Sequence, residues 1–229
     1  MSNHNNIVRI KVIAGLMDQL HEDVVFVGGA TVSLYADLKA AESRPTDDVD
    51  IIIELASYHK FVVLDERLRD AGFVNDTASG VICRYRIQGI TVDIMPTHPE
   101  AIGFSNKWYP DGFKESITVN IDGKSIKIFS LPYFIASKLE AFNNRGKGDY
   151  RFSSDFEDIV YVLENNSQVQ NLIMGASQEV RQYLQIAFKT MLNDSAFEEG
   201  LTAHLEPHTA QQQVLRIESM LKVIVEGML

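Results

Sequence analysis

The stretch "RPTDDVDIII", residues 44–53, places acidic side chains on a segment apolar enough to form a buried strand. Side chains i and i+2 of a strand share a face, so Asp48 and Asp50 project together while Val49 and Ile51 project into the core. Neighbouring carboxylates repel and raise each other's pKa unless a cation neutralises them. Hard divalent ions such as Mg²⁺ prefer oxygen ligands. The stretch therefore predicts a strand that carries a cation site, although most strand aspartates simply face solvent.

A short apolar run and a glycine pair precede this strand. Residues 24–29 read "VVFVGG", which predicts a buried strand ending in a tight turn, and residues 30–41 return to helical spacing. Glycines at such a junction let the backbone approach a phosphate, and a helix N-terminus offers unpaired N–H groups. Gly28-Gly29 is thus a candidate phosphate loop, or only a tight turn. Thr31 and Ser33 are candidate hydroxyl donors to phosphate, and a helix-capping or surface role fits them equally.

A third carboxylate lies on a later predicted strand, "ITVDIM", residues 90–95. The neighbours of Asp93 are apolar, so its side chain faces the opposite way from theirs. If this strand pairs beside the first, Asp48, Asp50 and Asp93 converge and complete one cation site. Asp47 is assigned to the loop before the strand and is left out of the site.

The flanking sequence predicts helices and hairpins. Helical spacing predicts helices over residues 7–20 and from Ser57 to Gly72, each with one buried face. Two-residue turns between apolar runs, Gln88-Gly89 and Asp122-Gly123, predict two hairpins. The loop between the hairpins, residues 96–113, carries aromatic side chains that fit either stacking on a base or domain packing.

Strand patterns stop near residue 130, and helices take over. The expected helices run over about 131–145, 154–165, 167–174, 177–193, 195–204 and 209–226. The predicted fold is α+β: an N-terminal domain, residues 1–130, with a small mixed β-sheet flanked by helices, then an all-helical C-terminal domain, residues 131–229.

The composition limits the class of protein. The chain has 229 residues, 45% of them hydrophobic, a formal net charge of −10 and one cysteine. The acidic balance argues against a broad basic surface, so no stable DNA binding is expected. A single cysteine excludes an internal disulfide and a cysteine-cluster zinc site. No apolar run approaches the roughly 18 residues of a membrane helix, so we expect a cytoplasmic protein without a membrane partner.

The order of these motifs resembles the polymerase-beta-type nucleotidyltransferase superfamily. A Gly-Gly turn after a strand, an Asp-hydrophobic-Asp strand and a single Asp on a later strand carry the resemblance, in "VGGATVSLY", "RPTDDVDIII" and "TVDIM". An Arg-x-Thr-x-Asp-hydrophobic-Asp pattern is similar to the AbiEii/AbiGii toxin-related branch, and four residues form it: Arg44, Thr46, Asp48 and Asp50. The likeness covers roughly residues 20–165.

A second block, "FIASKLEAFNNRGKGDYRFSSDFEDIVYVL", residues 134–163, resembles helices of the same branch. The residues that match are Lys138, Arg145, Asp155 and Asp158. From spacing alone, the same residues read as an interhelical salt bridge on a solvated surface.

The resemblance implies transfer of a nucleoside monophosphate from a nucleoside triphosphate (NTP) to an acceptor. It implies two Mg²⁺ ions, with Mn²⁺ as an alternative, held by Asp48, Asp50 and Asp93. It also implies that Asp93 helps to deprotonate the acceptor hydroxyl and that Lys138 is a catalytic residue that meets the triphosphate. The implied nucleotide-binding set is Gly28, Gly29, Thr31, Ser33, Arg44, Thr46, Lys138, Arg145, Asp155 and Asp158.

The acceptor and the biological role stay open at this level. Toxins of the resembled branch point to an RNA end such as that of tRNA, and to an antitoxin protein as partner; a protein or small-molecule acceptor is the alternative. The residues that would line a cleft for a tRNA end are Lys138, Arg145, Lys147 and Arg151. A second hypothesis is a non-catalytic binding or regulatory module, which has no need of a repelling carboxylate cluster. A third, a glycosyltransferase with an Asp-x-Asp motif, leaves Gly28-Gly29 and Asp93 without a purpose.

Overall fold

The computed structural model describes residues 2–37, 42–55, 57–103, 105–146 and 148–227, and the chain divides into two compact units. The first unit comprises residues 1–31 and 44–130, and the second comprises residues 32–43 and 131–229. Segment 32–43 therefore groups with the helices that follow residue 130. That residues 1–130 and 131–229 form two domains stays a prediction.

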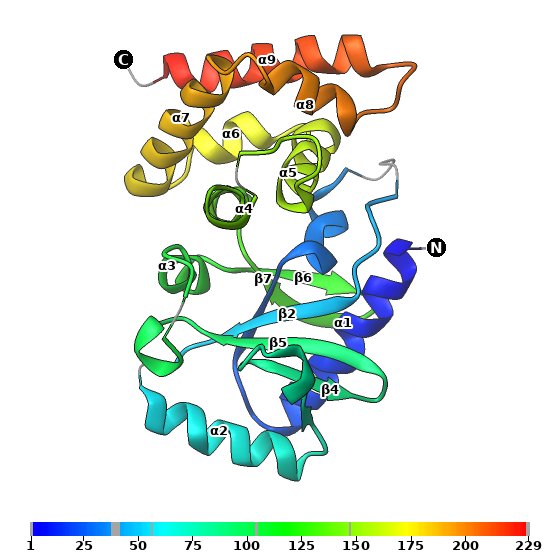
Figure 1. Cartoon of the computed structure of the whole chain (residues 1–229), viewed down its shortest axis with the longest axis vertical. Helices are drawn as coiled ribbons and strands as arrows, with labels where there is room; N and C mark the ends of the chain where they lie inside the picture. Colours follow the sequence, from blue (N-terminus) through cyan, green and yellow to red (C-terminus); the bar gives the residue numbers. More distant parts are fainter. Residues whose placement is uncertain (1, 38–41, 56, 104, 147, 228–229) are drawn as a thin grey trace. The chain divides into compact units, whose positions relative to one another are not determined.

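The first unit is built on a mixed β-sheet. Its strands are β1 (Val24–Val27), β2 (Asp48–Ile53), β3 (Val74–Asn75), β4 (Arg84–Ile87), β5 (Ile90–Pro96), β6 (Ile117–Ile121) and β7 (Lys124–Ile128). Among the described residues, their order in the sheet is β3-β4-β5-β2-β1-β7-β6. Strand β2 runs antiparallel to β1 and parallel to β5, which lies beside it in Figure 1. The predicted mixed sheet is confirmed, with β3 as an addition too short to leave a sequence pattern.

The two predicted hairpins form as their turn residues indicate. Strands β4 and β5 are joined through Gln88 and Gly89, and β6 and β7 through Asp122 and Gly123. All four turn residues have positive φ, between 48° and 83°. Asn, Asp and Gly are favoured in such turns because they tolerate this backbone conformation. Each turn contains two residues, so the register of each hairpin is fixed.

Helices cover one face of the sheet. They are α1 (Ser2–Gln19) and α2 (Tyr58–Asp70), and the first unit also contains η2 (Thr77–Ser79), η3 (Pro99–Ala101) and α3 (Tyr109–Lys114). Helix α1 begins earlier than expected, and it buries Ile10, Ile13 and Met17. Helix α2 is attached to its face of the sheet through Asp65, which accepts a hydrogen bond from the hydroxyl of Tyr85 in β4.

The segment after the Gly-Gly turn is not the α-helix that its spacing suggested. It is a 3₁₀ helix, η1 (Gly29–Tyr35). Residues 36–37 of the expected helix are not helical, and residues 38–41 lie outside the described residues. Backbone bonds of the i to i+3 type form there, for example from the Thr31 amide to the Gly28 carbonyl at 3.2 Å. The β-branched residues that follow the glycines disfavour a regular α-helix, and short 3₁₀ segments are common connectors.

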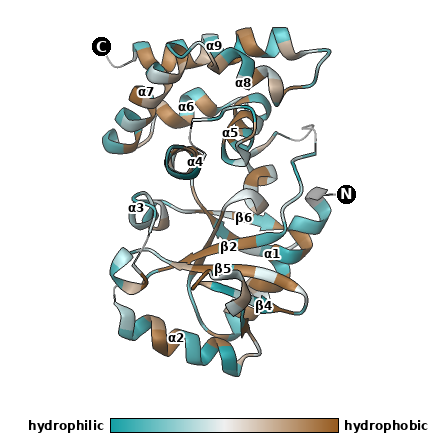
Figure 2. Ribbon diagram, viewed as in Figure 1, coloured by the Kyte–Doolittle hydropathy of each residue, from teal (hydrophilic) through white to brown (hydrophobic). Residues whose placement is uncertain are grey.

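The second unit is helical where the sequence predicted helices. They are α4 (Leu131–Arg145), α5 (Ser154–Asn165), α6 (Val169–Met174), α7 (Gln178–Leu192), α8 (Phe197–Ala203) and α9 (Ala210–Glu226). Figure 2 shows hydrophobic and hydrophilic residues alternating along α7 and α9, as expected for helices with one buried face. The apolar face of α9, with Val214, Ile217 and Leu221, is buried within this chain, and α9 packs against α7.

Within the part of the chain that the structure describes, no helix combines the length and the hydrophobicity that crossing a bilayer requires.

Candidate functional site

Three aspartates meet on the face of the sheet opposite α2. Strands β2 and β5 pair in parallel with Asp50 opposite Asp93, and Asp48 lies two residues earlier on β2. One carboxylate oxygen from each of the three lies within 4.8 Å of the others. The sequence predicted this convergence, and the backbone pairing is what produces it. We call Asp48, Asp50 and Asp93 the triad.

The triad stands on a buried strand, and solvent reaches its carboxylates to different degrees. Val49 and Ile51 of β2, which alternate with the aspartates, are fully buried. The side chain of Asp48 is 35% exposed, whereas that of Asp93 is 11% exposed. A buried strand thus fixes the position of carboxylates that solvent still reaches, which is the condition for binding a small ligand without reorganising the backbone.

The Gly-Gly turn is shaped around the triad. Gly28 has φ +73°, and a Cβ atom there would lie 1.9 Å from Oδ2 of Asp50. At Gly29 a Cβ atom would lie 2.5 Å from Nη2 of Arg44. Positive φ and close approach to Asp50 both favour glycine at position 28, and close approach to Arg44 and Thr46 favours it at position 29. The turn, Asp50 and Arg44 therefore form one packed arrangement.

The two hydroxyl residues after the turn occupy different positions. Thr31 is fully buried, and its hydroxyl donates a 2.9 Å hydrogen bond to the Gly28 carbonyl. This contact stabilises the turn from within. Ser33 is half-buried in η1 and belongs to the second unit. That either residue binds phosphate stays a prediction.

The approach to β2 is anchored by helix α1. The hydroxyl of Thr46 is buried and lies 3.1 Å from Oδ1 of Asn6. The guanidinium of Arg9 donates to the Thr46 carbonyl. The sequence reading identified Arg44 and Thr46, but it gave no role to Asn6 and Arg9, because nothing in their spacing connects α1 with residues 44–46.

Arg84 is the site residue that the sequence reading missed. It opens β4 and stands opposite Asp93 in the antiparallel pairing. Its Nε lies 2.8 Å from Oδ1 of Asp93, and its Nη2 lies 2.7 Å from Oδ2 of Asp93 and 3.1 Å from Oδ2 of Asp48. The hydrogen bond with Asp93 raises the pKa of Arg84 above its ordinary value. A signal for this contact was present: counting outward from the two-residue turn at Gln88-Gly89 pairs position 84 with position 93.

Cys83 lies beside this contact but is not chemically available. Burial, and then the negative charge of Asp93, raise the pKa of the Cys83 thiol to about 12. Both effects favour the protonated thiol at neutral pH, so Cys83 lacks the lowered pKa that is typical of a reactive cysteine.

The residues of the second matching block, within residues 134–163, form a cluster inside the second unit. Nζ of Lys138 in α4 lies 3.1 Å from Oδ1 of Asp155 and 2.6 Å from Oδ2 of Asp158, both in α5. Arg145 donates two hydrogen bonds to the Asp155 carboxylate, at 2.7 and 2.8 Å. We call these four residues the helical cluster. It is the interhelical salt bridge weighed above, except that it is buried rather than solvated.

Burial and charge act in opposite directions on the helical cluster. The side chains of Lys138, Asp155 and Asp158 are at most 7% exposed, whereas that of Arg145 is 71% exposed. Burial alone would raise the pKa of Asp155, but the hydrogen bond from Arg145 and the charge of Lys138 hold it below its ordinary value. The lowered pKa keeps Asp155 ionised at neutral pH, and the cluster contains two acidic and two basic side chains.

The aromatic and basic residues suggested for substrate contact differ in burial and in the partners they contact. Trp108 is buried, which fits packing rather than an open stacking face. Tyr109 contacts the ring of Phe129, with 6.1 Å between ring centroids. Of the residues proposed to line a tRNA cleft, Lys147 lies outside the described residues, and Arg151 pairs with Glu199 at 3.2 Å.

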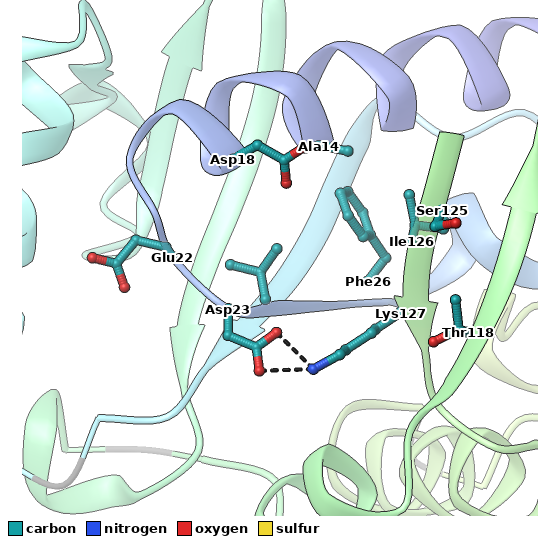
Figure 3. Close-up of a pocket in the computed structure, with 10 residues that line it drawn as sticks. Ala14, Asp18, Glu22, Asp23, Phe26, Thr118, Ser125, Ile126 and Lys127 are labelled. Carbon is teal, nitrogen blue, oxygen red and sulfur yellow. Dashed lines mark hydrogen bonds and ion pairs between the residues drawn. The ribbon is translucent and has the colours of Figure 1, made fainter. Parts of the chain in front are cut away.

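A cavity of about 210 Å³ lies elsewhere in the first unit (Figure 3). Val24 and Phe26 of β1 line it, and they alternate with Val27, the cross-strand partner of Asp50. Their side chains therefore project from the sheet face opposite the triad. Figure 3 shows Lys127 and Asp23 bridged across the cavity edge, 2.7 Å apart. We leave this cavity out of the candidate site.

Comparisons with known proteins identify the fold. No protein-family model matches the sequence, and no curated protein matches it. Among solved structures, the chain is similar to an antigenic nucleotidyltransferase-like protein from Paracoccidioides brasiliensis, with 18% identity, a TM-score of 0.53, and coverage of 90% of this chain and 96% of that one. It is also similar to the antibiotic-resistance factor ANT(2'')-Ia, with 15% identity, a TM-score of 0.49, and coverage of 83% and 94%. The first of these shows that the chain has a nucleotidyltransferase-like fold.

Proposed function

We propose that this protein transfers a nucleoside monophosphate from an NTP to an acceptor hydroxyl. One observation carries the proposal: three carboxylates from neighbouring parallel strands meet beside a glycine turn that leaves room for Asp50 and for nothing larger than hydrogen at Gly28. The nucleotidyltransferase-like fold supports it. A structural role alone gives no reason to gather three repelling carboxylates on an accessible sheet face.

The donor set fits divalent cations. Asp48, Asp50 and Asp93 offer carboxylate oxygens, the ligands that Mg²⁺ and Mn²⁺ prefer, and three such oxygens lie close enough to share ions. When bound, two such ions supply charge neutralisation for the attacking and leaving oxygens of an in-line displacement. The AbiEii/AbiGii-related branch remains a proposal that rests on the Arg44, Thr46, Asp48 and Asp50 pattern.

The other roles in the reaction are assigned to residues of this chain. The acceptor oxygen bonds to the α-phosphorus as the bond to pyrophosphate breaks, and we assign the acceptor proton to the carboxylate of Asp93. The backbone N–H groups of Gly28-Gly29 and the guanidinium of Arg44, which packs on that turn, are assigned to the phosphates. Thr31 and Thr46 then serve mainly to hold this arrangement, because their hydroxyls are buried in hydrogen bonds.

We keep the helical cluster as a proposed nucleotide contact. Arg145 is largely exposed while its guanidinium holds Asp155, so it can meet a phosphate without opening the cluster. Lys138 is buried between Asp155 and Asp158, and a direct contact with the triphosphate requires it to exchange a partner. Of the two, Arg145 is therefore the better-placed phosphate ligand.

The non-catalytic alternative has one observation in its favour. Arg84 already neutralises part of the triad through Asp93 and Asp48, so the carboxylates depend less on a metal ion for their charge balance. A binding or regulatory module that kept the fold would show the same contact. The experiment below separates the two readings.

For the acceptor, we propose an RNA end such as that of tRNA, with a protein or a small molecule as alternatives. The role as toxin of a toxin–antitoxin or abortive-infection system, with an antitoxin protein as partner, follows from the family resemblance. The net charge of −10 disfavours a large nucleic-acid footprint, so any RNA contact is expected to be local.

The test incubates the protein with each labelled NTP, Mg²⁺ and, in separate reactions, total tRNA, the protein alone and common small acceptors. Label transfer is expected for the wild type and is lost in an Asp48→Ala/Asp50→Ala variant. Asp47→Ala is the matched control, because Asp47 is exposed and outside the triad. Absence of transfer to every acceptor by folded protein would favour the non-catalytic module.

A further inference from the structure

The strand pairing determines where Arg84 points. Residues directly opposite each other in an antiparallel pair project from the same face of the sheet. Arg84 stands opposite Asp93, so its guanidinium lies on the triad face, whereas Tyr85 points to the face that α2 covers. The arginine is thus built into the site by the register of the β4–β5 hairpin.

The guanidinium holds two members of the triad at once. It contacts both oxygens of Asp93 in the planar two-bond geometry that makes arginine–carboxylate pairs strong, and it reaches Oδ2 of Asp48 with the nitrogen shared between them. The side chain of Arg84 is 26% exposed, so water weakens this pairing only in part. In this state a single positive charge lies within hydrogen-bond distance of two carboxylates that a cation would need.

We propose that Arg84 is the resident counter-ion of the triad, which a divalent cation has to displace from Asp48 and Asp93 in order to bind. The oxygens that Arg84 engages belong to the carboxylates proposed as metal ligands, and a guanidinium beside a divalent cation is repelled by it. In the absence of a cation, Arg84 keeps the carboxylates in place by neutralising one of their three charges. The proposal rests on the proposed function in one respect, that the triad is a divalent-cation site.

Arg84 leaves the carboxylates when a cation replaces it, and not when the pH changes. A guanidinium stays protonated at any pH at which proteins fold, and no change of pH in that range removes its charge. Cation binding therefore competes with an ion pair of constant charge. The consequence is a site that binds divalent cations more weakly than its carboxylates alone would, and that holds its shape without them.

The experiment measures Mn²⁺ binding by titration calorimetry in the wild type and in Arg84→Gln. We expect Arg84→Gln to bind Mn²⁺ at least about tenfold more tightly, equivalent to about 1.4 kcal/mol. Arg86→Gln is the matched control, because Arg86 lies on the same strand but pairs with Asp76 outside the triad, and it is expected to keep wild-type affinity. Wild-type affinity in Arg84→Gln would overturn the proposal.

A second readout does not depend on Mn²⁺ affinity. In the presence of a chelator, the melting temperature of Arg84→Gln is expected to fall below that of Arg86→Gln, and added Mn²⁺ is expected to remove the difference. If Arg84→Gln does not fold, Arg84→Lys decides: it keeps the charge but loses the two-bond contact, so tighter Mn²⁺ binding than the wild type supports the proposal and equal binding overturns it.

Asp50→Asn in the same titration separates this inference from the proposed function. If Asp50→Asn abolishes Mn²⁺ binding while Arg84→Gln leaves it unchanged, the counter-ion role fails and the cation site stands. If wild-type Mn²⁺ binding is insensitive to Asp50→Asn, the triad is no cation site, and both proposals fall together.

Discussion

The triad and the helical cluster are two groups of acids and bases that differ in charge balance. In the triad three carboxylates meet on a face that solvent reaches, and the guanidinium of Arg84 pairs with two of them, Asp48 and Asp93. In the helical cluster two carboxylates meet one lysine and one arginine, and three of the four side chains are buried. Three carboxylates that solvent reaches can take up a cation, whereas the buried acids of the helical cluster are matched by an equal number of bases, of which only Arg145 is exposed. The first arrangement is suited to binding and the second to holding helices together.

The largest expected effect comes from breaking the helical cluster. Lys138→Met leaves Asp155 and Asp158 buried without the ammonium between them, and removing one partner of a buried ion pair typically destabilises by about 3–5 kcal/mol. Urea unfolding measures the loss. The control is Lys222→Met, whose exposed pairing with Glu218 contributes less than about 1 kcal/mol. Equal effects of the two substitutions would contradict the view that the cluster is structural.

Stabilisation by ATP and Mg²⁺ is the second test that distinguishes the triad from the helical cluster. At ATP and Mg²⁺ concentrations about 100 times the dissociation constant, binding stabilises the folded protein by about 2.7 kcal/mol. Asp50→Asn is expected to remove this gain, seen as a lost shift in melting temperature, without unfolding the protein. An undiminished shift would place the nucleotide away from the triad.

Gly28→Ala tests how closely the turn and the triad are packed. Its Cβ atom would overlap Oδ2 of Asp50, and its φ of +73° is unfavourable for alanine. Backbone strain of this kind costs about 1–3 kcal/mol, and the displaced carboxylate should weaken ATP-Mg²⁺ binding as well. Gly80→Ala is the matched control, because Gly80 has φ +71° with nothing within 4 Å of the added Cβ. It should share the stability loss but keep the ligand-induced shift in melting temperature.

The smallest expected effect is a change in the free energy of unfolding at acid pH. The pKa of Asp155 is lowered in the folded protein from the ordinary value of 3.8, so its contribution to stability is full above that value and is lost as the pH falls through the folded pKa. Arg145→Gln removes the hydrogen bonds that lower this pKa. Its free energy of unfolding should therefore lie below that of the wild type at neutral pH and approach it as the pH falls below about 4. A difference that does not change with pH would show that Arg145 acts through packing instead.

Much of the fold and part of the site could be read from the sequence. Alternating or continuous apolar runs predicted β1, β2 and β5, and the turn dipeptides fixed both hairpins. Helical periodicity located α4 to α9. The convergence of Asp48, Asp50 and Asp93 followed from face alternation once the pairing of β2 with β5 was assumed. These features depend on local pattern, which sequence expresses directly.

The features that were missed depend on contacts between distant segments. Asn6 and Arg9 reach Thr46 from another element, and no periodicity records such a contact. The spacing of Lys138 and Asp155 predicted a salt bridge but not its burial, because burial depends on what packs around two helices. The 3₁₀ form of η1 was missed because i, i+3 spacing is common to both helix types.

The turn at Gln88-Gly89 is exposed and lies at the far end of its hairpin from Asp93, yet its length decides which side chain meets that carboxylate. An insertion that moved the register by one residue would present the phenol of Tyr85 to the triad and direct Arg84 toward the face under α2. Proteins that share this site should therefore keep the two-residue length of this turn, and should vary its composition only among residues that tolerate positive φ. A surface loop that would ordinarily tolerate insertions is, in this chain, part of the specification of the site.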